Sequence, residues 1–254
     1  MIMKNTVKFA ETAEELRTAY QLRYKLYVEN MNRCLDISDH KNRELRDPSD
    51  EYGRIIISVK NNETRGTLRL LWGADRPFNY KQTENYNLSP FLSTMGAEKV
   101  CIIERLMVDK QSRQSLTLLQ MYDMVMQFIL NNKIELVVIS AEAHYFSSYL
   151  KQGFRHHAKP YNNPGLGPTT PMAWVVGDYD HLIKVGSPYA ALASADQLSY
   201  CQHTNDLLKI VNQEFIKAQP LINAISDLPD TPLVETDTQP KIFQHRLKLK
   251  LLAA

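Results

Sequence analysis

The segment Val100–Asn132 constrains the fold more than any other part of the chain. It begins with an apolar run that is interrupted only by the adjacent charged residues Glu104 and Arg105. A short polar turn follows, and then Ser115–Leu130, which is dense in leucine, methionine, valine and isoleucine and contains neither proline nor glycine. This order predicts a strand that leads through a turn into a long buried helix. The N-terminus of that helix, with its unpaired N–H groups, would face the turn and form an anion site.

Length, composition and net charge exclude several classes of protein for this chain. The 254 residues suffice for one large domain or one domain with a tail, and an apolar fraction of 44% is ordinary for a soluble globular protein. No apolar run approaches the ~20 residues of a membrane span. The N-terminal residues contain no apolar signal core, so we expect a cytoplasmic protein. Three cysteines provide neither a disulfide framework nor a metal-binding spacing, and a net charge of +2 argues against general nucleic-acid binding.

Hydrophobic periodicity predicts strands and helices on both sides of the central segment. Thr12–Glu15 is a T-x-x-E capping box that begins a helix extending to about Glu29. A short helix is expected at Glu142–Gln152, with Gly153 as its C-terminal cap. The other expected strands are Arg54–Lys60, Thr64–Trp72, Lys133–Ser140, Phe154–Ala158 and Met172–Val176. This order predicts an α/β fold with a mixed twisted sheet of about six or seven strands flanked by helices.

The remaining segments are expected to be loops or a C-terminal extension. Residues 30–53, 74–98 and 160–171 are polar or rich in proline and glycine, which is typical of loops. From Ser187 the character changes: residues 196–219 are expected to be helical, residues 220–240 to be a loop, and the R-L-K-L-K-L-L end to be an edge strand. We therefore divide the chain into a main domain, residues 1–188, and a helical extension and tail, residues 189–254, packed on the same domain.

Short motifs between Leu22 and Pro188 occur in an order that points to one family. They are L-R-Y-K-L-Y-V-E (Leu22–Glu29), Asp47-x-x-Asp50, G-T-L-R-L-L (Gly66–Leu71), I-E-R-L-M-V (Ile103–Val108), Y-x-x-x-G-F (Tyr149–Phe154) and H-L-x-x-x-x-S-P (His181–Pro188). Together they resemble the GNAT acyltransferase superfamily, in its branch of autoinducer (acyl-homoserine-lactone) synthases and long-chain N-acyl amino acid synthases. There is one departure: the glutamate of that branch lies three residues before the arginine, where this chain has Ile102, and here Glu104 is adjacent to Arg105.

The resemblance implies a GNAT fold and an acyl thioester as donor. GNAT enzymes that use acetyl-CoA carry glycines in the turn before the helix, so that the backbone can close on the pyrophosphate. This chain instead has Arg113, Gln114, Ser115 and Thr117 there, whose side chains would crowd a pyrophosphate. The single phosphodiester of a carrier-protein phosphopantetheine requires less of this loop. We therefore favour an acyl carrier protein as donor, with acyl-CoA as the alternative, and expect no bound cofactor and no metal.

Acyl carrier proteins are acidic, and a basic rim would steer one to the thioester entrance. The loops and helix ends expected to flank that entrance carry Lys110, Arg113, Lys133, Lys151, Arg155, His156, His157 and Lys159. The alternative is that these are scattered, solvated charges. No nucleic acid is expected as a partner, and contact with a membrane is expected only through the acyl product.

Acyl transfer to an amine requires a base, an oxyanion site and an acid. Glu104 is the candidate base, directly or through a water, and its alternative role is to neutralise Arg69 or Arg105 within the sheet. Backbone N–H groups around Met107 and Val108 are the candidate oxyanion donors. By resemblance, Tyr149 is the candidate acid for the leaving thiolate, and its alternative is a packed core tyrosine.

The acceptor side is expected to be an ion network. The resemblance assigns the amine-bearing substrate to a site shaped by Arg23, Asp47, Asp50, Arg69 and Arg105. Carboxylates and guanidiniums can form such a bidentate network, and an arginine could also hold an acceptor carboxylate. The alternative is an ion network that only holds the fold. The helix methionines Met121, Met124 and Met126 could line a slot for an acyl chain or belong to a plain core.

These observations predict an N-acyltransferase. It would move a medium or long acyl chain from an acyl carrier protein to the amine of an amino acid or related small amine. The alternatives are an autoinducer synthase, an enzyme that acylates a peptide or polyamine, and a non-catalytic domain that binds an acyl group or carrier protein.

Overall fold

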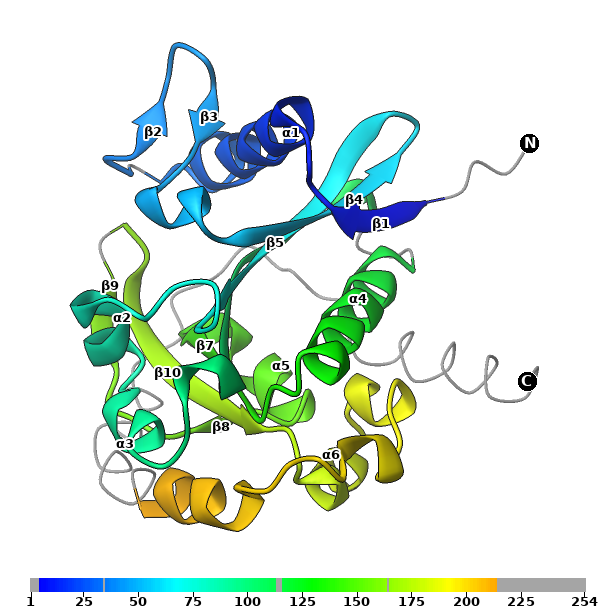
Figure 1. Ribbon diagram of the computed structural model, residues 1–254. Coiled ribbons are helices and arrows are strands. Elements are labelled where there is room, and N and C mark those ends of the chain that lie inside the picture. Colours follow the sequence, from blue (N-terminus) through cyan, green and yellow to red (C-terminus); the bar gives the residue numbers. More distant parts are fainter. Residues whose placement is uncertain (1–4, 34, 113–115, 164, 214–254) are drawn as a thin grey trace.

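A twisted sheet with helices on both faces organises the computed structural model, which describes residues 5–33, 35–112, 116–163 and 165–213 (Figure 1). In this part of the chain, eight strands form one sheet in the order β1-β4-β5-β6-β7-β10-β8, and β9 pairs with β10. The strands are β1 (Thr6–Phe9), β4 (Arg54–Lys60), β5 (Glu63–Trp72), β6 (Val100–Val108), β7 (Leu136–Glu142), β8 (Arg155–His156), β9 (Tyr161–Asn163) and β10 (Gly167–Val175). A small hairpin of β2 (Ser38–Asp39) and β3 (Glu44–Leu45) stands apart from this sheet.

The central strands β6 and β7 are the one parallel pair among the described strands of the sheet. Their register covers only Val100–Ile102 against Leu136–Val138. β6 continues to Val108 and β7 to Glu142, so the two strands run on beyond their shared ladder and diverge. This divergence opens the sheet at its centre.

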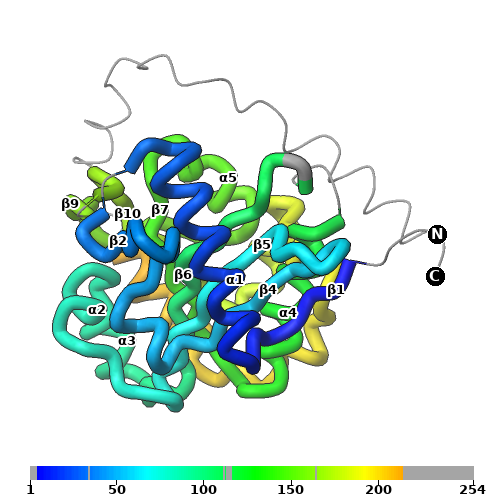
Figure 2. The backbone as a smooth tube through the Cα atoms, turned by 90° about the horizontal axis from the view of Figure 1, so that it is seen from above, coloured from blue at the N-terminus to red at the C-terminus, as the bar shows by residue number. Residues whose placement is uncertain are grey.

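The first face of the sheet is covered by the N-terminal helix and by segments from the middle and end of the chain. Helix α1 (Ala13–Tyr24) begins at the predicted capping box, in which both reciprocal hydrogen bonds are present, and continues as a π-helical turn to Asn30. It crosses β4 and β5 (Figures 1 and 2). Helices α2 (Tyr80–Asn85) and α3 (Ser89–Leu92), with helical residues 204–213, are packed on the other part of this face.

The opposite face is covered by α4 (Thr117–Asn131), α5 (Phe146–Lys151), α6 (Tyr179–Val185) and the 3₁₀ turn Pro188–Ala191. The two faces use alternate residues of each strand, as the period of two requires. On β4, Ile56 packs in the α4 core, whereas Ile55 and Ile57 pack against α1. Buried positions on both sides explain why the strand sequences are nearly continuous in apolar residues.

The C-terminal extension is packed on the main domain as far as residue 213. Tyr189 and Leu198 belong to the core beneath α4, and Leu207 and Val211 belong to the core beneath α3. The buried carboxylate of Glu135 accepts hydrogen bonds from the backbone N of His203 at 2.9 Å and from its Nδ1 at 3.1 Å. These contacts anchor the start of the last described helix.

The predicted mixed sheet is confirmed, and several local predictions need correction. The sheet has eight strands rather than six or seven, because the short strands β1 and β9 were not recognised. Residues 74–98 were expected to be a loop but contain α2 and α3. Helix α2 begins at a capping box of Asn79 and Gln82. The helix expected at residues 196–219 is interrupted: a 3₁₀ turn spans Asp196–Leu198, and helical residues resume at 204. The predicted loop and edge strand beyond residue 219 lie outside the described residues.

No helix in the described ranges combines the length and the apolar character that crossing a membrane requires.

Gly153 allows a stability test of the turn that ends α5. Its φ is +102°, and an added Cβ would lie 2.4 Å from Leu182 Cδ2. We expect Gly153→Ala to lower the free energy of unfolding by about 2–5 kcal/mol, from backbone strain and overpacking. Gly167→Ala is the matched control, because its φ is +80° but its Cβ would meet nothing within 4 Å. Urea unfolding should show a clearly larger loss for Gly153→Ala; equal losses would contradict the contact with Leu182.

Candidate active site

Arg69 lies at the centre of a buried ion network on the α1 face of the sheet. It stands on β5 opposite Glu104 of β6, and 3% of its side chain is exposed. Its Nη1 donates to Asp47 Oδ1 at 2.6 Å and to Asp50 Oδ1 at 2.8 Å. Its Nε donates to Glu104 Oε2 at 3.2 Å, and its Nη2 contacts the same oxygen. One guanidinium therefore joins carboxylates from a sheet strand and from the 3₁₀ turn that follows Asp47.

Two further arginines balance the charge of the network. Arg23, fully buried on α1, donates from Nη1 to Asp50 Oδ1 at 2.7 Å. Arg105 donates from Nη2 to Asp47 Oδ2 at 2.9 Å, and its guanidinium lies 5.5 Å from the centre of the Tyr27 ring. The network thus unites the five predicted acceptor residues with Glu104, as three cations and three anions. Burial of these charges is tolerable because each has an opposite partner.

A β-bulge in β6 brings two adjacent residues into this network. Adjacent side chains of a regular strand point to opposite faces. The register between β5 and β6 shifts between Thr67 and Arg69, and Arg105 adopts a left-handed φ of +55°. The additional residue turns Arg105 towards Asp47, on the side where Glu104 meets Arg69. A chain in which the glutamate and arginine are adjacent can therefore still place both in one cluster.

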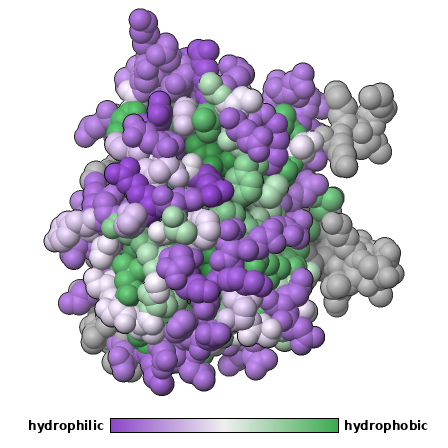
Figure 3. Space-filling model, in the orientation of Figure 1, coloured by the Kyte–Doolittle hydropathy of each residue, from purple (hydrophilic) through white to green (hydrophobic). Residues whose placement is uncertain are grey.

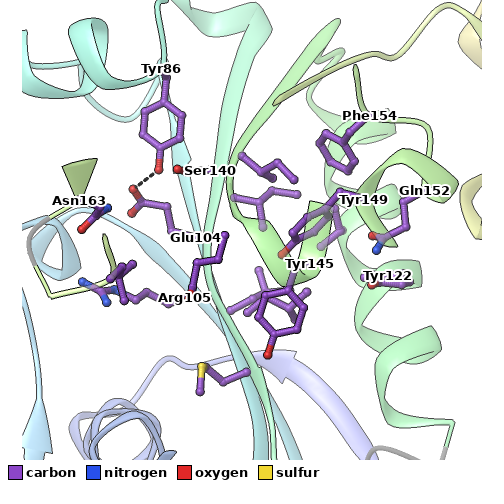
Figure 4. Close-up of a pocket in the computed structure, with 18 of the residues that line it drawn as sticks. Tyr86, Glu104, Arg105, Tyr122, Ser140, Tyr145, Tyr149, Gln152, Phe154 and Asn163 are labelled. Atoms are coloured by element: carbon purple, nitrogen blue, oxygen red, sulfur yellow. Dashed lines mark hydrogen bonds between the residues drawn. The ribbon is translucent and has the colours of Figure 1, made fainter. Parts of the chain in front are cut away.

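Glu104 is the carboxylate of the network that reaches the pocket. The hydroxyl of Tyr86 donates to Glu104 Oε1 at 2.6 Å (Figure 4). Both carboxylate oxygens are thus held, one by Arg69 and one by Tyr86, while 21% of the side chain stays exposed. The predicted ion pair between Glu104 and Arg69 is present. Its role as a base stays a prediction. Tyr86 follows α2, in the stretch that was expected to be a loop, and no local pattern singled it out.

Opposing effects of burial and charge set the protonation of the network. Burial alone would raise the pKa of the Asp47 carboxyl, but the guanidiniums of Arg69 and Arg105 outweigh it and lower that pKa to about 2. Burial alone would lower the pKa of Arg69, but Glu104, Asp47 and Asp50 hold it well above the ordinary value. Burial, and next the charge of Glu104, raise the pKa of Tyr86 well above its usual range. Asp47 and Arg69 are therefore ionised, and Tyr86 is a neutral hydrogen-bond donor to Glu104.

A pocket passes through the sheet at the point where β6 and β7 diverge. Its cavity volume is about 140 Å³. Glu104, Tyr86, Ser140 and Asn163 line it on the network side of β6, and Tyr149, Tyr122, Gln152 and Phe154 line it on the other side (Figure 4). Because Glu104 and Tyr149 come from opposite faces of the sheet, an amine near the first and a thioester near the second could meet in the gap.

The inner chamber of this pocket, on the α4 face, is apolar with a rim of hydroxyl groups. Its apolar lining is Leu68, Ile103, Leu106, Val125, Ile139 and Phe154. Tyr149 lies in this lining, so it belongs both to the pocket and to the packing of α5. Burial raises the pKa of the Tyr149 hydroxyl above its usual range, which keeps it protonated. Tyr122 and Tyr189, which the sequence did not single out, stand beside it, whereas Met121 and Met126 are fully buried core residues.

The residues predicted to bind the donor are only partly described. Met107 lines the pocket, and Met107 and Val108 pair with Thr67 and Gly66 at the end of β6. Thr117 is buried at the start of α4, and its Oγ1 accepts a hydrogen bond from Asn5 Nδ2 at 3.3 Å. Its hydroxyl is thus turned into the protein. Arg113, Gln114 and Ser115 lie outside the described residues.

The predicted basic rim does not form as a unit. His156 and His157 are buried, and His157 Nε2 lies 2.9 Å from the carbonyl oxygen of Tyr86. Arg155 is paired with Asp178. Lys133 follows the C-terminal end of α4, about 22 Å along the helix from the predicted phosphate site at its N-terminus. The face shown in Figure 3 is mostly hydrophilic, with apolar areas near its centre.

Comparison with known families gives one match. The model described as FeeM, N-acyl amino acid synthase FeeM, matches residues 18–174. A comparison with curated protein sequences finds no match.

Several solved structures share the fold. FeeM, an N-acyl amino acid synthase from uncultured soil microbes, is similar with a TM-score of 0.57 at 12% identity, over 73% of this chain and 97% of that chain. The acyl-homoserine lactone synthase LasI is similar with a TM-score of 0.52 at 14% identity, over 67% of this chain and 89% of that chain. BjaI, a CoA-dependent acyl-homoserine lactone synthase, is similar with a TM-score of 0.53 at 16% identity, over 73% of this chain and 91% of that chain. At these identities the likeness shows the fold alone, and the expected GNAT fold is confirmed.

The lowered pKa of Asp47 predicts a loss of stability in acid. A carboxyl with a pKa of 3.8 unfolded and about 2 folded stabilises the native state by about 2 kcal/mol. This contribution is present above pH 3.8 and is lost as the pH falls to about 2. Asp47→Asn should therefore be less stable than wild type at pH 6, with a difference that shrinks towards pH 2. Asp123→Asn, an exposed position on α4, is the control, and a constant difference for Asp47→Asn in urea unfolding would contradict the ion pairs.

Proposed function

The chain belongs to the FeeM family of N-acyl amino acid synthases, and on this premise we propose that it transfers an acyl group from an acyl carrier protein to the amine of an amino acid or a related small amine. As a member of that family it is an acyltransferase. The observation that carries the proposal is the pocket through the sheet, with a held carboxylate at one end and an apolar chamber at the other. The acyl group is proposed to be of medium length, because the cavity measures about 140 Å³.

The amine is proposed to bind on the network side of the gap. Glu104 is the proposed base, because it is the carboxylate of the network that lines the pocket. An ordinary amine, with a pKa of about 8–10, is mostly protonated at neutral pH and must lose a proton before it attacks. Since Oε1 of Glu104 already accepts from the Tyr86 hydroxyl, the proton would reach it through that hydroxyl or through a water. The ion pair with Arg69 keeps the carboxylate oriented.

The thioester is proposed to bind at the end of β6, with its acyl chain in the inner chamber. The amine nitrogen attacks the carbonyl carbon, and the C–N bond forms as the C–S bond breaks. N–H groups around Met107 and Val108 are the proposed donors to the developing oxyanion. Tyr149, which stays protonated, is the proposed hydrogen-bond donor to the leaving thiolate.

The carrier protein is proposed as donor on grounds of sequence. The turn before α4 has no glycine, and its side chains would crowd the pyrophosphate of CoA. BjaI, described as CoA-dependent, has the same fold, so the fold alone does not select the carrier. The proposal therefore rests on the turn, and Arg113, Gln114 and Ser115 are proposed to lie near the phosphodiester. The hydroxyl of Thr117 is turned into the protein and is not included.

Product analysis with matched donors tests this function. The purified protein should convert a hexanoyl donor and a mixture of amino acids into an N-acyl amino acid, detected by mass spectrometry. With the same acyl chain, kcat/KM should be higher for acyl carrier protein than for acyl-CoA, because the turn before α4 would crowd the pyrophosphate of CoA. Equal or better use of acyl-CoA at low salt would overturn the choice of carrier. A lactone formed in a parallel reaction with S-adenosylmethionine as acceptor, whose sulfonium is the leaving group on ring closure, would indicate an autoinducer synthase. Absence of thioester consumption would indicate a non-catalytic domain.

Glu104→Gln tests the proposed base. The amide keeps the shape and the contact with Tyr86 but removes the charge. Arg69 retains Asp47 and Asp50 as partners, so the variant should stay folded. Turnover per folded molecule should fall roughly 10²–10⁴-fold and should recover in part at higher pH, where more amine is neutral.

Tyr86→Phe is the matched control for this variant. It leaves the charge of Glu104 in place and removes only the hydroxyl that Oε1 accepts from. Its loss of turnover should be smaller. A Glu104→Gln protein that melts early but turns over normally per folded molecule would assign Glu104 to the support of Arg69 alone.

A further inference from the structure

Tyr189 lines the inner chamber of the pocket from a segment beyond the family match. The match ends at residue 174, and Tyr189 lies in the 3₁₀ turn Pro188–Ala191. Its side chain lines the pocket and is only 2% exposed. The chamber therefore owes one of its walls to the segment that follows the matched region.

The ring of Tyr189 is held by aromatic contacts on two sides. It stacks on Trp174 of β10 with ring centroids 4.4 Å apart and an interplanar angle of 25°. The ring of Tyr122, on α4, lies 5.2 Å away at 43°. Trp174 is fully buried, so the Tyr189 ring has a rigid surface behind it. These two contacts therefore restrict movement of the Tyr189 ring.

The backbone of Tyr189 is fixed by the neighbouring serine. Ser187 Oγ accepts a hydrogen bond from the N–H of Tyr189 at 3.2 Å and donates to the carbonyl oxygen of Gln152 at 2.6 Å. Gln152 itself lines the pocket. The serine of the H-L-x-x-x-x-S-P motif thus ties the turn that carries Tyr189 to the end of α5, which carries Tyr149. This contact assigns a structural role to a motif that the proposed chemistry does not use.

The space in front of Tyr189 is small. The whole cavity measures about 140 Å³. A cavity of about 150 Å³ holds one benzene molecule, that is, about six carbon atoms. An acyl chain of more than about six carbons would therefore collide with the Tyr189 ring unless that ring moved.

We propose that Tyr189 sets the upper limit of acyl length, so that the enzyme accepts donors with up to about six acyl carbons and rejects longer ones at this ring. The proposal rests on the proposed function and refines its substrate class. Removal of the phenol ring, which is about the size of benzene, would roughly double the cavity and admit about six further carbons.

Binding of acyl-pantetheine thioesters tests this limit without any acceptor. Isothermal titration calorimetry with saturated chains of 4 to 14 carbons, about the range that the cavity and its enlarged form span, should give a wild-type affinity that rises roughly fourfold per methylene and falls beyond about six carbons. We call the chain length at which affinity stops rising the break. Tyr189→Ala should move this break to about twelve carbons. Tyr189→Phe should leave the break unchanged, because it keeps the ring and removes only the hydroxyl.

Two further variants separate chain length from stability. Leu198→Ala truncates a buried side chain of the same core that does not line the pocket, so it should weaken folding without moving the break. Should Tyr189→Ala fail to fold, Val125→Phe tests the limit from the other direction. Val125 lines the chamber on α4, and a larger side chain there should move the break to shorter chains.

The outcomes distinguish this proposal from the proposed function. A break that stays in place in folded Tyr189→Ala would overturn the role of Tyr189, whatever the enzyme transfers. A break that stays in place in Val125→Phe would overturn the chamber as the site of the length limit. A break that moves as expected in a protein that forms no amide would support the length limit and overturn the proposed function. A wild type that binds no acyl-pantetheine would overturn both.

Discussion

The pairing of Arg69 with three carboxylates is the interaction on which the α1 side of the sheet depends. A buried guanidinium is costly without partners, and breaking a buried ion pair typically costs about 3–5 kcal/mol. Arg69 meets this constraint by joining β6, through Glu104, to the 3₁₀ turn that carries Asp50. Arg23 extends the same cluster to α1. Space for it requires Gly53, where an added Cβ would lie 2.6 Å from Arg69 Cδ. The N-terminal helix and its following turn are thus held over the sheet by charge as well as by apolar packing.

The divergence of β6 and β7 connects this network to the pocket, which Glu104 and Arg105 line. If the two strands stayed paired beyond Ile102 and Val138, the sheet would separate Glu104 on one face from Tyr149 on the other. Because the ladder stops there, one pocket joins both faces. The arrangement matches the needs of an N-acyltransferase, whose amine and thioester must approach from different sides and meet at a single carbon. A held carboxylate, neutral tyrosines and an apolar chamber are the groups that this chain brings to that point.

Much of the fold could be predicted from local pattern. The hairpin of β4 and β5, the helix α4 and the capping box at Thr12 follow from alternation, from an unbroken apolar run and from a four-residue motif. Contacts between distant segments were not accessible in this way. His157 was assigned with Lys110 to the basic rim, yet it is buried against the Tyr86 carbonyl. Lys133 follows the C-terminal end of α4 and therefore lies a helix length away from the turn at its N-terminus. Tyr86 and Tyr189 enter the pocket from segments without any distinctive pattern, because their positions depend on the packing of α2 and of the C-terminal extension.

The sequence by itself determined that a charged pair had to be accommodated inside an apolar strand, and its ordered motifs determined the family. These conclusions need only side-chain chemistry and spacing along the chain. The tertiary structure decided what the pair does. A regular strand would send Glu104 and Arg105 to opposite faces, and only the bulge, which is defined by the register of β6 against β5, turns both towards Asp47 and Arg69. The size of the chamber was likewise decided in three dimensions. One of its walls is the ring of Tyr189, from beyond the matched region. That ring packs against Trp174, and no local pattern encodes this contact.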